Sequence, residues 1–138
     1  MNKALENLKK LKDIYYEVQE ATFGENLKLK LKLLSSEEET NVHSFAMSYE
    51  QGLAYLYSVK RETINYAIIS LNNEDIPEFI EEGSEKIQRH VWLRKNITVG
   101  WNQMLIDQIW NHYAKLILKV EERILGTIKT EEKIEDKK

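Results

Sequence analysis

The sequence predicts a mainly α fold: a single-domain bundle of four or five helices with one short β-strand or hairpin near residues 27–34. Two observations favour this class. Apolar residues recur at intervals of three and four over most of the chain, which is the period of a helix that buries one face. One short stretch instead alternates leucine with lysine, which is the period of a strand. We expect one helical domain over residues 1–126, followed by a charged, disordered tail over residues 127–138.

The first helix is expected from about Lys3 to Glu20, because its apolar residues share one face and charged residues lie between them. Gly24 is expected to end it, since glycine readily adopts the left-handed conformation on which helices often stop. Residues 27–34 then change period and predict a strand with one apolar and one charged face. The alternating residues are Leu27, Leu29, Leu31 and Leu33 on one face and Lys28, Lys30 and Lys32 on the other.

A single strand leaves its backbone amides and carbonyls unpaired, so this segment needs a neighbour. Three neighbours are compatible with the sequence: residues 42–49, a second copy of the chain, or another protein. With another chain the pairing would be β-augmentation, in which backbone hydrogen bonds supply affinity and the leucines fix the register. The remaining alternative is an extended arm that packs over a pair of helices.

The next helix is expected to begin at one of two serines, Ser35 or Ser36, and to run towards Gly52. Serine side chains accept hydrogen bonds from free amides at a helix start, and the acidic run Glu37–Glu39 suits the positive end of the helix dipole. A competing interpretation makes residues 42–49 a second strand, because their large apolar side chains also alternate. The agreement between the serine and glutamate signals favours the helix.

Three further helices are predicted from apolar periodicity: residues 53–71, residues 84–96 and residues 99–125. A turn rich in asparagine and aspartate ends the first of them before Pro77, and one helical turn is expected near residues 78–82. Thr98 is expected to cap the last helix, which should stop at Gly126.

The predicted helices carry more apolar surface than a small monomer usually covers. On the last helix, Trp101 and Trp110 flank the main stripe and widen its apolar arc to about 180°, against about 100° for an ordinary surface helix. A second stripe contains two tyrosines, whose large rings and polar tips are common at protein interfaces. A buried helix whose tyrosines form internal hydrogen bonds explains this second stripe equally well. The predicted partner-contact residues are Leu27, Leu29, Leu31, Leu33, Tyr55, Val59, Tyr66, Trp101 and Trp110.

Sequence motifs for catalysis are not found: the chain has no phosphate-binding loop, nucleophile elbow, zinc-protease pair or dinucleotide fingerprint. The three histidines, His43, His90 and His112, lie on separate segments, so a metal-dependent enzyme is the weakest of the interpretations. The glutamates occur in runs that are typical of solvated faces. The sequence therefore predicts a protein that is not an enzyme, with no catalytic residue, no cofactor and no metal.

The net charge of −3 and the isoelectric point near 5.7 argue against a dedicated nucleic-acid-binding protein. The alternative function is a regulatory binding module that contacts nucleic acid through the basic and aromatic cluster at residues 86–95, although the acidic stretch 78–82 offsets its charge. No apolar run reaches the ~20 residues of a membrane helix, so a membrane-spanning protein is not expected. No membrane partner is expected either. The absence of cysteine agrees with a reducing cytoplasm. The cluster contains Lys86, Arg89, Arg94 and Lys95 around Trp92.

The order of the segments resembles a known group of proteins. The leucine–lysine segment runs into LLSSEEE, then into YLYSVKRETINYAIISLNNEDI, and the chain closes with WNQMLIDQIWNHYAKL. This pattern, over residues 27–118, resembles small assembly proteins of tailed bacteriophages, namely tail-assembly chaperones and baseplate-hub assembly proteins. The resemblance implies a helical, non-enzymatic protein in the cytoplasm of a bacterial host or in a virion. Its implied partners are other phage tail or baseplate proteins, further copies of itself, or both.

Overall fold

The computed structural model describes residues 2–14, 16–48 and 51–136. The helices in this part are α1 (Lys3–Ile14), α2 (Ser36–Ala46), α3 (Leu53–Ala67), α4 (Arg89–Asn96) and α5 (Gln103–Asp136), with a short 3-10 helix, η1 (Thr98–Gly100), before α5. The strands are β1 (Val18–Phe23), β2 (Leu27–Lys32), β3 (Ile68–Leu71), β4 (Glu74–Asp75), β5 (Phe79–Glu82) and β6 (Glu85–Gln88). The described fold is therefore mixed α and β, and the predicted mainly α bundle with one short strand or hairpin is wrong.

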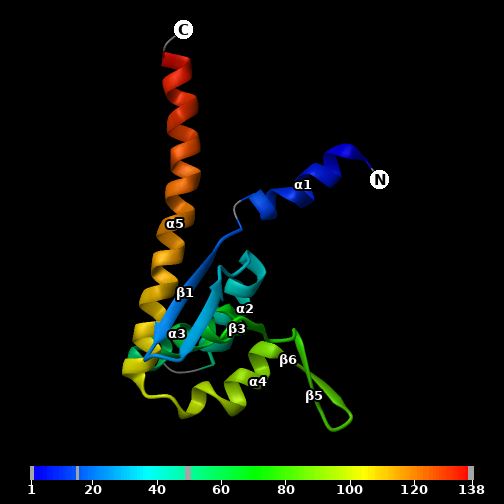
Figure 1. Cartoon of the computed structure of the whole chain (residues 1–138), viewed down its shortest axis with the longest axis vertical. Coiled ribbons are helices and arrows are strands. Elements are labelled where there is room, and N and C mark those ends of the chain that lie inside the picture. Colours follow the sequence, from blue (N-terminus) through cyan, green and yellow to red (C-terminus); the bar gives the residue numbers. More distant parts are fainter. Residues whose placement is uncertain (1, 15, 49–50, 137–138) are drawn as a thin grey trace.

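The first four strands form one antiparallel sheet in the order β1–β2–β3–β4, while β5 and β6 form a separate hairpin (Figure 1). The leucine–lysine segment is β2, an inner strand, because Lys30 pairs with Glu20 of β1 on one side and with Ser70 of β3 on the other. The neighbours of β2 are therefore neither residues 42–49 nor a second chain, and the segment is not an extended arm. Each of these expectations is corrected by the sheet.

β1 occupies residues that the sequence assigned to the first helix. That helix ends at Ile14, and β1 pairs with β2 along its whole length. Gly24 has a φ of +62°, a left-handed conformation that glycine reaches without strain, so it turns the β1–β2 hairpin instead of ending a helix. Ala21 of β1 is fully buried, which ties the hairpin to the core.

α3 also ends earlier than the sequence predicted, at Ala67, and the chain continues directly as β3. Ile68 and Ile69 are β-branched residues that suit a strand once a neighbouring strand is present. Asn72 and Asn73 then adopt φ values of 51° and 66°, and two consecutive positive φ angles are what a tight type I′ hairpin turn requires. The asparagine-rich segment therefore turns a hairpin and does not end a helix.

The β5–β6 hairpin replaces two helical predictions. It occupies residues 79–88, where the sequence predicted a helical turn near residues 78–82 and the start of a helix at residue 84. Gly83 has a φ of +67°, so it makes the turn of this hairpin. α4 begins only at Arg89, and Figure 1 shows the hairpin projecting from the body beside α4.

α2 begins as the sequence indicated, and the helical interpretation of this segment is confirmed up to Ala46. The Ser35 hydroxyl oxygen accepts a hydrogen bond from the Glu38 amide at 3.2 Å, and the Glu38 carboxylate accepts one from the Ser35 amide at 2.9 Å. This reciprocal pair is a capping box. Residues 49–50, at the end of the alternative strand, lie outside the described residues.

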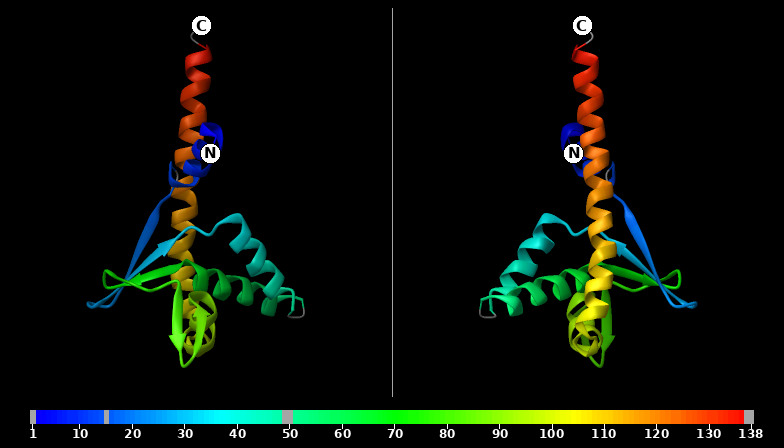
Figure 2. Two further views of the ribbon diagram at one scale, coloured as in Figure 1. Left: turned by 90° about the vertical axis from the view of Figure 1, so that its right-hand side faces the viewer. Right: turned by 90° about the vertical axis from the view of Figure 1, so that its left-hand side faces the viewer.

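α5 is the longest helix. The Asn102 side chain accepts a hydrogen bond from the Leu105 amide at 2.9 Å, whereas Thr98, the predicted cap, lies in η1. The helix continues past Gly126, where the sequence predicted its end. Residues 137–138 of the predicted tail lie outside the described residues. Figure 2 shows α5 extending well beyond the sheet.

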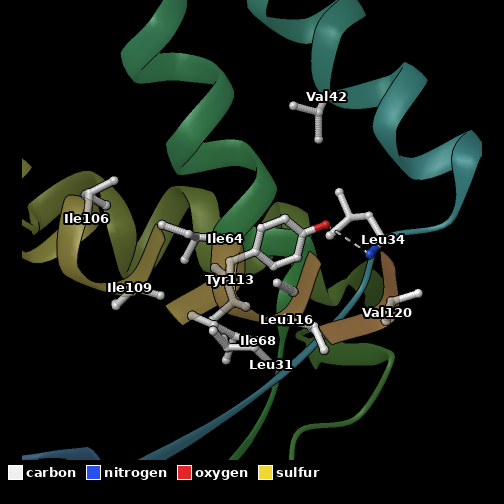
Figure 3. Close-up of a cluster of buried hydrophobic side chains, with 12 residues drawn as sticks. Leu31, Leu34, Val42, Ile64, Ile68, Ile106, Ile109, Tyr113, Leu116 and Val120 are labelled. Atoms are coloured by element: carbon white, nitrogen blue, oxygen red, sulfur yellow. Dashed lines mark hydrogen bonds between the residues drawn. The ribbon is translucent and has the colours of Figure 1, made fainter. Parts of the chain in front are cut away.

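The core lies where α3 and α5 pack against the sheet. Tyr113 of α5 is at its centre, and the hydroxyl oxygen of this tyrosine accepts a hydrogen bond from the Leu34 amide at 3.2 Å (Figure 3). Burial raises the pKa of Tyr113 to about 12, so its hydroxyl stays protonated at any physiological pH. The surrounding apolar residues include Leu31, Val42, Ile64, Ile68, Ile106, Ile109, Leu116 and Val120. Among the described residues, no helix combines the length and apolar character needed to cross a bilayer.

Candidate functional site

An apolar cavity of about 410 Å³ lies between the tip of the β1–β2 hairpin and the segment that joins α4 to α5. Every described residue of its lining is apolar. The hairpin supplies one wall, and β3 and the chain after β4 supply a second. The floor and the third wall come from α4, from the residues on either side of η1, and from α5. The lining residues are Phe23, Leu27, Leu29, Ile68, Leu71, Ile76, Trp92, Leu93, Ile97, Trp101, Leu105 and Ile109.

The period of β2 explains why leucines reach this cavity. Side chains two residues apart on a strand share a face, so Leu27, Leu29 and Leu31 all point to the same side of the sheet. Leu31 is fully buried in the core, while the two preceding leucines lie beyond it and line the cavity. Leu27 is 51% exposed and Leu71 of β3 is 40% exposed, which places these two residues at the mouth.

A buried polar network holds the floor of the cavity in place. Glu62 of α3 is only 1% exposed, and both of its carboxylate oxygens accept hydrogen bonds from Arg94 Nε of α4, at 3.1 and 3.0 Å. Asn65 Nδ2 also donates to Glu62, at 3.0 Å, and Thr98 Oγ1 donates to Asn65 Oδ1 at 2.8 Å. The network therefore joins α3, α4 and η1, the elements that position the two tryptophans of the cavity.

Sequence reasoning did not identify Glu62, because the residue lies in the charged run Lys60-Arg61-Glu62, which reads as solvated surface. The available signal was its spacing from Asn65, one helical turn further along α3, in a segment that turns apolar immediately afterwards. Glu62 is paired with Arg94, so it is an ordered ion pair within the fold.

Three of the predicted partner-contact residues, Leu27, Leu29 and Trp101, meet in the cavity. Two more, Leu33 and Val59, pack against the core. Two leucines of the predicted strand and one of the two predicted tryptophans thus line the same cavity, although they lie far apart in the sequence.

The tyrosine stripe and Trp110 do not join this group. Tyr55 shares a hydrogen bond of 2.9 Å with His43 Nδ1, and the Tyr66 ring stacks on His90 with centroids 3.9 Å apart. The Trp110 ring packs against the core, 5.6 Å from the ring of Tyr113.

A second, polar cleft of about 250 Å³ lies beside the stacked Tyr66 and His90 rings. Burial lowers the pKa of His90, so this ring is neutral at pH 7. Burial also raises the pKa of Tyr66. The cleft is lined by Glu37, Glu38, Asn41, Tyr66, Glu78, Phe79, Gln88, Arg89 and His90.

The histidines stay apart in the structure. His43 and His90 each contact a tyrosine, and His112 packs edge-on against Phe23 with ring centroids 5.9 Å apart. Within residues 2–14, 16–48 and 51–136, no group of three histidine or carboxylate side chains is placed to hold a metal ion.

The basic cluster at residues 86–95 is dispersed by the fold. Trp92 lines the apolar cavity, so its ring is turned towards the cavity wall. Arg94 pairs with Glu62, and Arg89 Nη1 donates to the Ile76 carbonyl at 2.9 Å. The arrangement therefore weakens the alternative of base stacking on Trp92 between basic side chains.

Comparison of the chain with protein-family models, with curated proteins and with solved structures finds no match. The chemistry of the lining distinguishes the apolar cavity from the polar cleft. Sites for small molecules usually combine apolar walls with a few polar groups that orient the ligand. The described lining of the apolar cavity offers no polar side chain for this purpose, so it suits apolar groups that are oriented by contacts outside the cavity.

Proposed function

We propose that the protein is a non-enzymatic binding protein whose apolar cavity takes up apolar side chains of a protein partner. The observation that carries this proposal is that every described residue lining the cavity is apolar. The cavity is open to solvent at Leu27 and Leu71. Exposed apolar surface of this kind is unfavourable in water, so covering it with apolar groups provides binding free energy.

A protein segment fits the cavity better than a free small molecule. The backbone of a partner supplies the orientation that the lining cannot provide, because its polar groups stay outside the cavity. Trp92 and Trp101 supply large rigid rings, and tryptophan is enriched among residues that dominate binding energy at interfaces. An apolar cavity of about 150 Å³ holds one benzene ring, so this one admits about two or three side chains of that size. An amphipathic helix presents such side chains three and four residues apart.

The phage resemblance supplies the class of partner in this proposal. The helical fold that the resemblance implied is not the observed fold, so the proposal takes from it only the mode of action and the setting. The partners would be other phage tail or baseplate proteins, bound in the cytoplasm of a bacterial host or within a virion. The protein would then act as an assembly or structural protein through protein–protein contacts.

A charge at the cavity mouth tests the binding surface. The apolar dye anilinonaphthalene sulfonate would be titrated into the purified protein, and we expect Leu27→Glu to weaken the fluorescence enhancement about tenfold. Leu53→Glu is the matched control, because Leu53 is also an exposed leucine but does not line the cavity. Equal dye binding by both variants would show that the cavity is not the apolar binding site.

Site-specific photocrosslinking tests the partner. A photoreactive phenylalanine at position 71 would be compared with the same residue at position 53, with phage tail and baseplate proteins co-expressed one at a time. We expect a tail or baseplate protein to crosslink to position 71. This crosslink should disappear when Leu27→Glu is added. Crosslinks only from position 53 would contradict the proposal.

A further inference from the structure

The mouth of the apolar cavity carries negative charge on its hairpin side. Glu25 stands in the turn of the β1–β2 hairpin, between the lining residues Phe23 and Leu27. Glu74 of β4 is paired with Leu71 across the β3–β4 hairpin, and residues paired in this way share a face of the sheet. Glu74 therefore lies on the cavity face, beside the mouth. Figure 2 shows the turns of these two hairpins projecting side by side.

The charge of these two carboxylates is not neutralised by the fold. Neither glutamate forms an ion pair with any residue in the part of the chain that the structure describes. Lys28 and Lys30 of β2 lie on the opposite face of the sheet, because they alternate with the leucines that face the cavity. Lys28 is also paired on that face with Glu20, at 3.0 Å. The hairpin side of the mouth therefore attracts positive charge.

The opposite side of the mouth lacks negative charge. It is built from α4, the segment that joins α4 to α5, and the first turn of α5, and this stretch, residues 89–106, contains no aspartate or glutamate. Val99 is 65% exposed and lies between the lining residues Ile97 and Trp101, so it adds an apolar side chain to this side. The exposed residues of the stretch include Lys95, Asn96, Val99 and Asn102. The mouth is thus acidic along the hairpins and neutral to basic along α4.

The backbone at the mouth favours a helix as the occupant. The Lys28 carbonyl accepts a hydrogen bond from the Asn72 amide at 2.8 Å, and the Lys28 amide donates to Asn72 Oδ1 at 2.9 Å. An extended segment laid between Leu27 and Leu71 therefore meets strands that are already paired with each other. A helix needs no such pairing, because its own amides and carbonyls form hydrogen bonds within the helix.

We infer that the cavity takes an amphipathic helix of a protein partner, with lysine or arginine along one border of its apolar stripe and uncharged or acidic residues along the other. The basic border faces Glu25 and Glu74, and the other border faces α4. Turning the helix end for end would exchange the two borders, so the charges also select its direction. This inference rests on the proposed function, because it names the kind of segment that the same cavity binds.

Three helical peptides of equal length test the inference. The first carries leucines at positions i, i+3, i+4 and i+7 with lysines along one border, the second has glutamates in place of those lysines, and the third has serines in place of the leucines. Each would be labelled with fluorescein and titrated with the purified protein at low salt, with fluorescence anisotropy as the readout. We expect the lysine peptide to bind about tenfold more tightly than the glutamate peptide. The serine peptide should bind most weakly.

Paired variants of the protein locate the charge effect. Glu25→Gln/Glu74→Gln should reduce the preference for the lysine peptide to about twofold or less, because glutamine keeps the shape of the side chain and removes its charge. Glu82→Gln/Glu85→Gln is the matched control, since both residues are exposed glutamates beside the turn of the β5–β6 hairpin and neither lines the cavity. It changes the net charge equally and should leave the preference unchanged.

The outcomes separate this inference from the proposed function. Equal affinity for the lysine and glutamate peptides, with both binding more tightly than the serine peptide, would overturn the inference and leave the proposed function standing. Equal affinity for all three peptides would contradict both. A preference that falls equally in the two double variants would also overturn the inference, because the net charge of the protein, and not the carboxylates at the mouth, would then attract the lysines.

Discussion

At the scale of single residues, Glu62 has the greatest influence on the arrangement of the site. Its buried carboxylate binds Arg94 and Asn65, and so fixes α4 relative to α3. A buried ion pair adds little net stability compared with apolar packing. Removing one partner is nevertheless costly, because the other charge is left buried without a counter-charge. The pair therefore acts mainly as a constraint on the position of the cavity floor.

We expect Arg94→Met to lower the free energy of unfolding by about 3–5 kcal/mol, because it leaves the Glu62 carboxylate buried without its counter-charge. Urea denaturation followed by circular dichroism measures this loss. Adding Glu62→Gln to Arg94→Met should recover part of the lost stability. The glutamine side chain is neutral, and its oxygen can still accept a hydrogen bond from Asn65 Nδ2. No recovery in the double variant would show that the loss comes from packing alone.

Burial makes the stability of the protein depend on pH near neutrality. It lowers the pKa of both His90 and His112 below the usual value of 6.5, so the unfolded chain binds protons more readily than the folded chain. The stability contributed by the neutral rings is complete above pH 6.5 and is lost as the pH falls below it. Denaturation between pH 7.5 and pH 5 should show this decline, and His90→Gln should reduce its slope. An unchanged slope in both His90→Gln and His112→Gln would contradict the assignment.

At the scale of secondary structure, the sequence succeeds where the signal is local. The capping box of α2 depends on Ser35 and Glu38, three residues apart, and both are visible in the sequence. β1 and β3 depend on β2, which is distant in the sequence. Ile68 continues the apolar pattern of α3, and only the neighbouring strand makes it part of a sheet.

The same distinction applies to the candidate site. Leu27, Leu29 and Trp101 were predicted as partner contacts because their patterns are local. Phe23 and Ile68 could not be assigned to the site, since hairpin and sheet pairing bring them there. The sequence surrounds Trp92 with basic neighbours, yet the structure places its ring in the apolar wall. A local pattern identifies an apolar side chain, but the long-range pairing decides what it faces.

The inner position of β2 predicts the effect of a proline. Lys30 lies between β1 and β3, so Lys30→Pro removes an amide donor from the middle of the sheet. We expect a loss of about 2 kcal/mol or more in the free energy of unfolding. Lys30→Thr is the control, because threonine keeps the amide and suits a strand. Nearly equal urea midpoints for the two variants would show that the pairing at this position contributes little.

At the scale of the whole molecule, α5 carries two apolar surfaces. Its first turns line the cavity with Leu105 and Ile109, and further along the helix Leu118 and Leu125 are exposed. The nine residues from Ile109 to Leu118 span about 14 Å of helix, so the two surfaces share no contact residue.

This separation predicts that the exposed leucines of α5 do not contribute to binding in the cavity. Leu27→Glu should abolish most dye binding, while Leu125→Glu should leave dye binding nearly unchanged. Effects of substitutions more than about 10 Å apart usually add, so the double variant should show the sum of the two single effects. Dye titration of all four proteins completes the cycle. A coupling free energy above about 0.5 kcal/mol would show that α5 transmits a change between its ends, and that the two surfaces form one site.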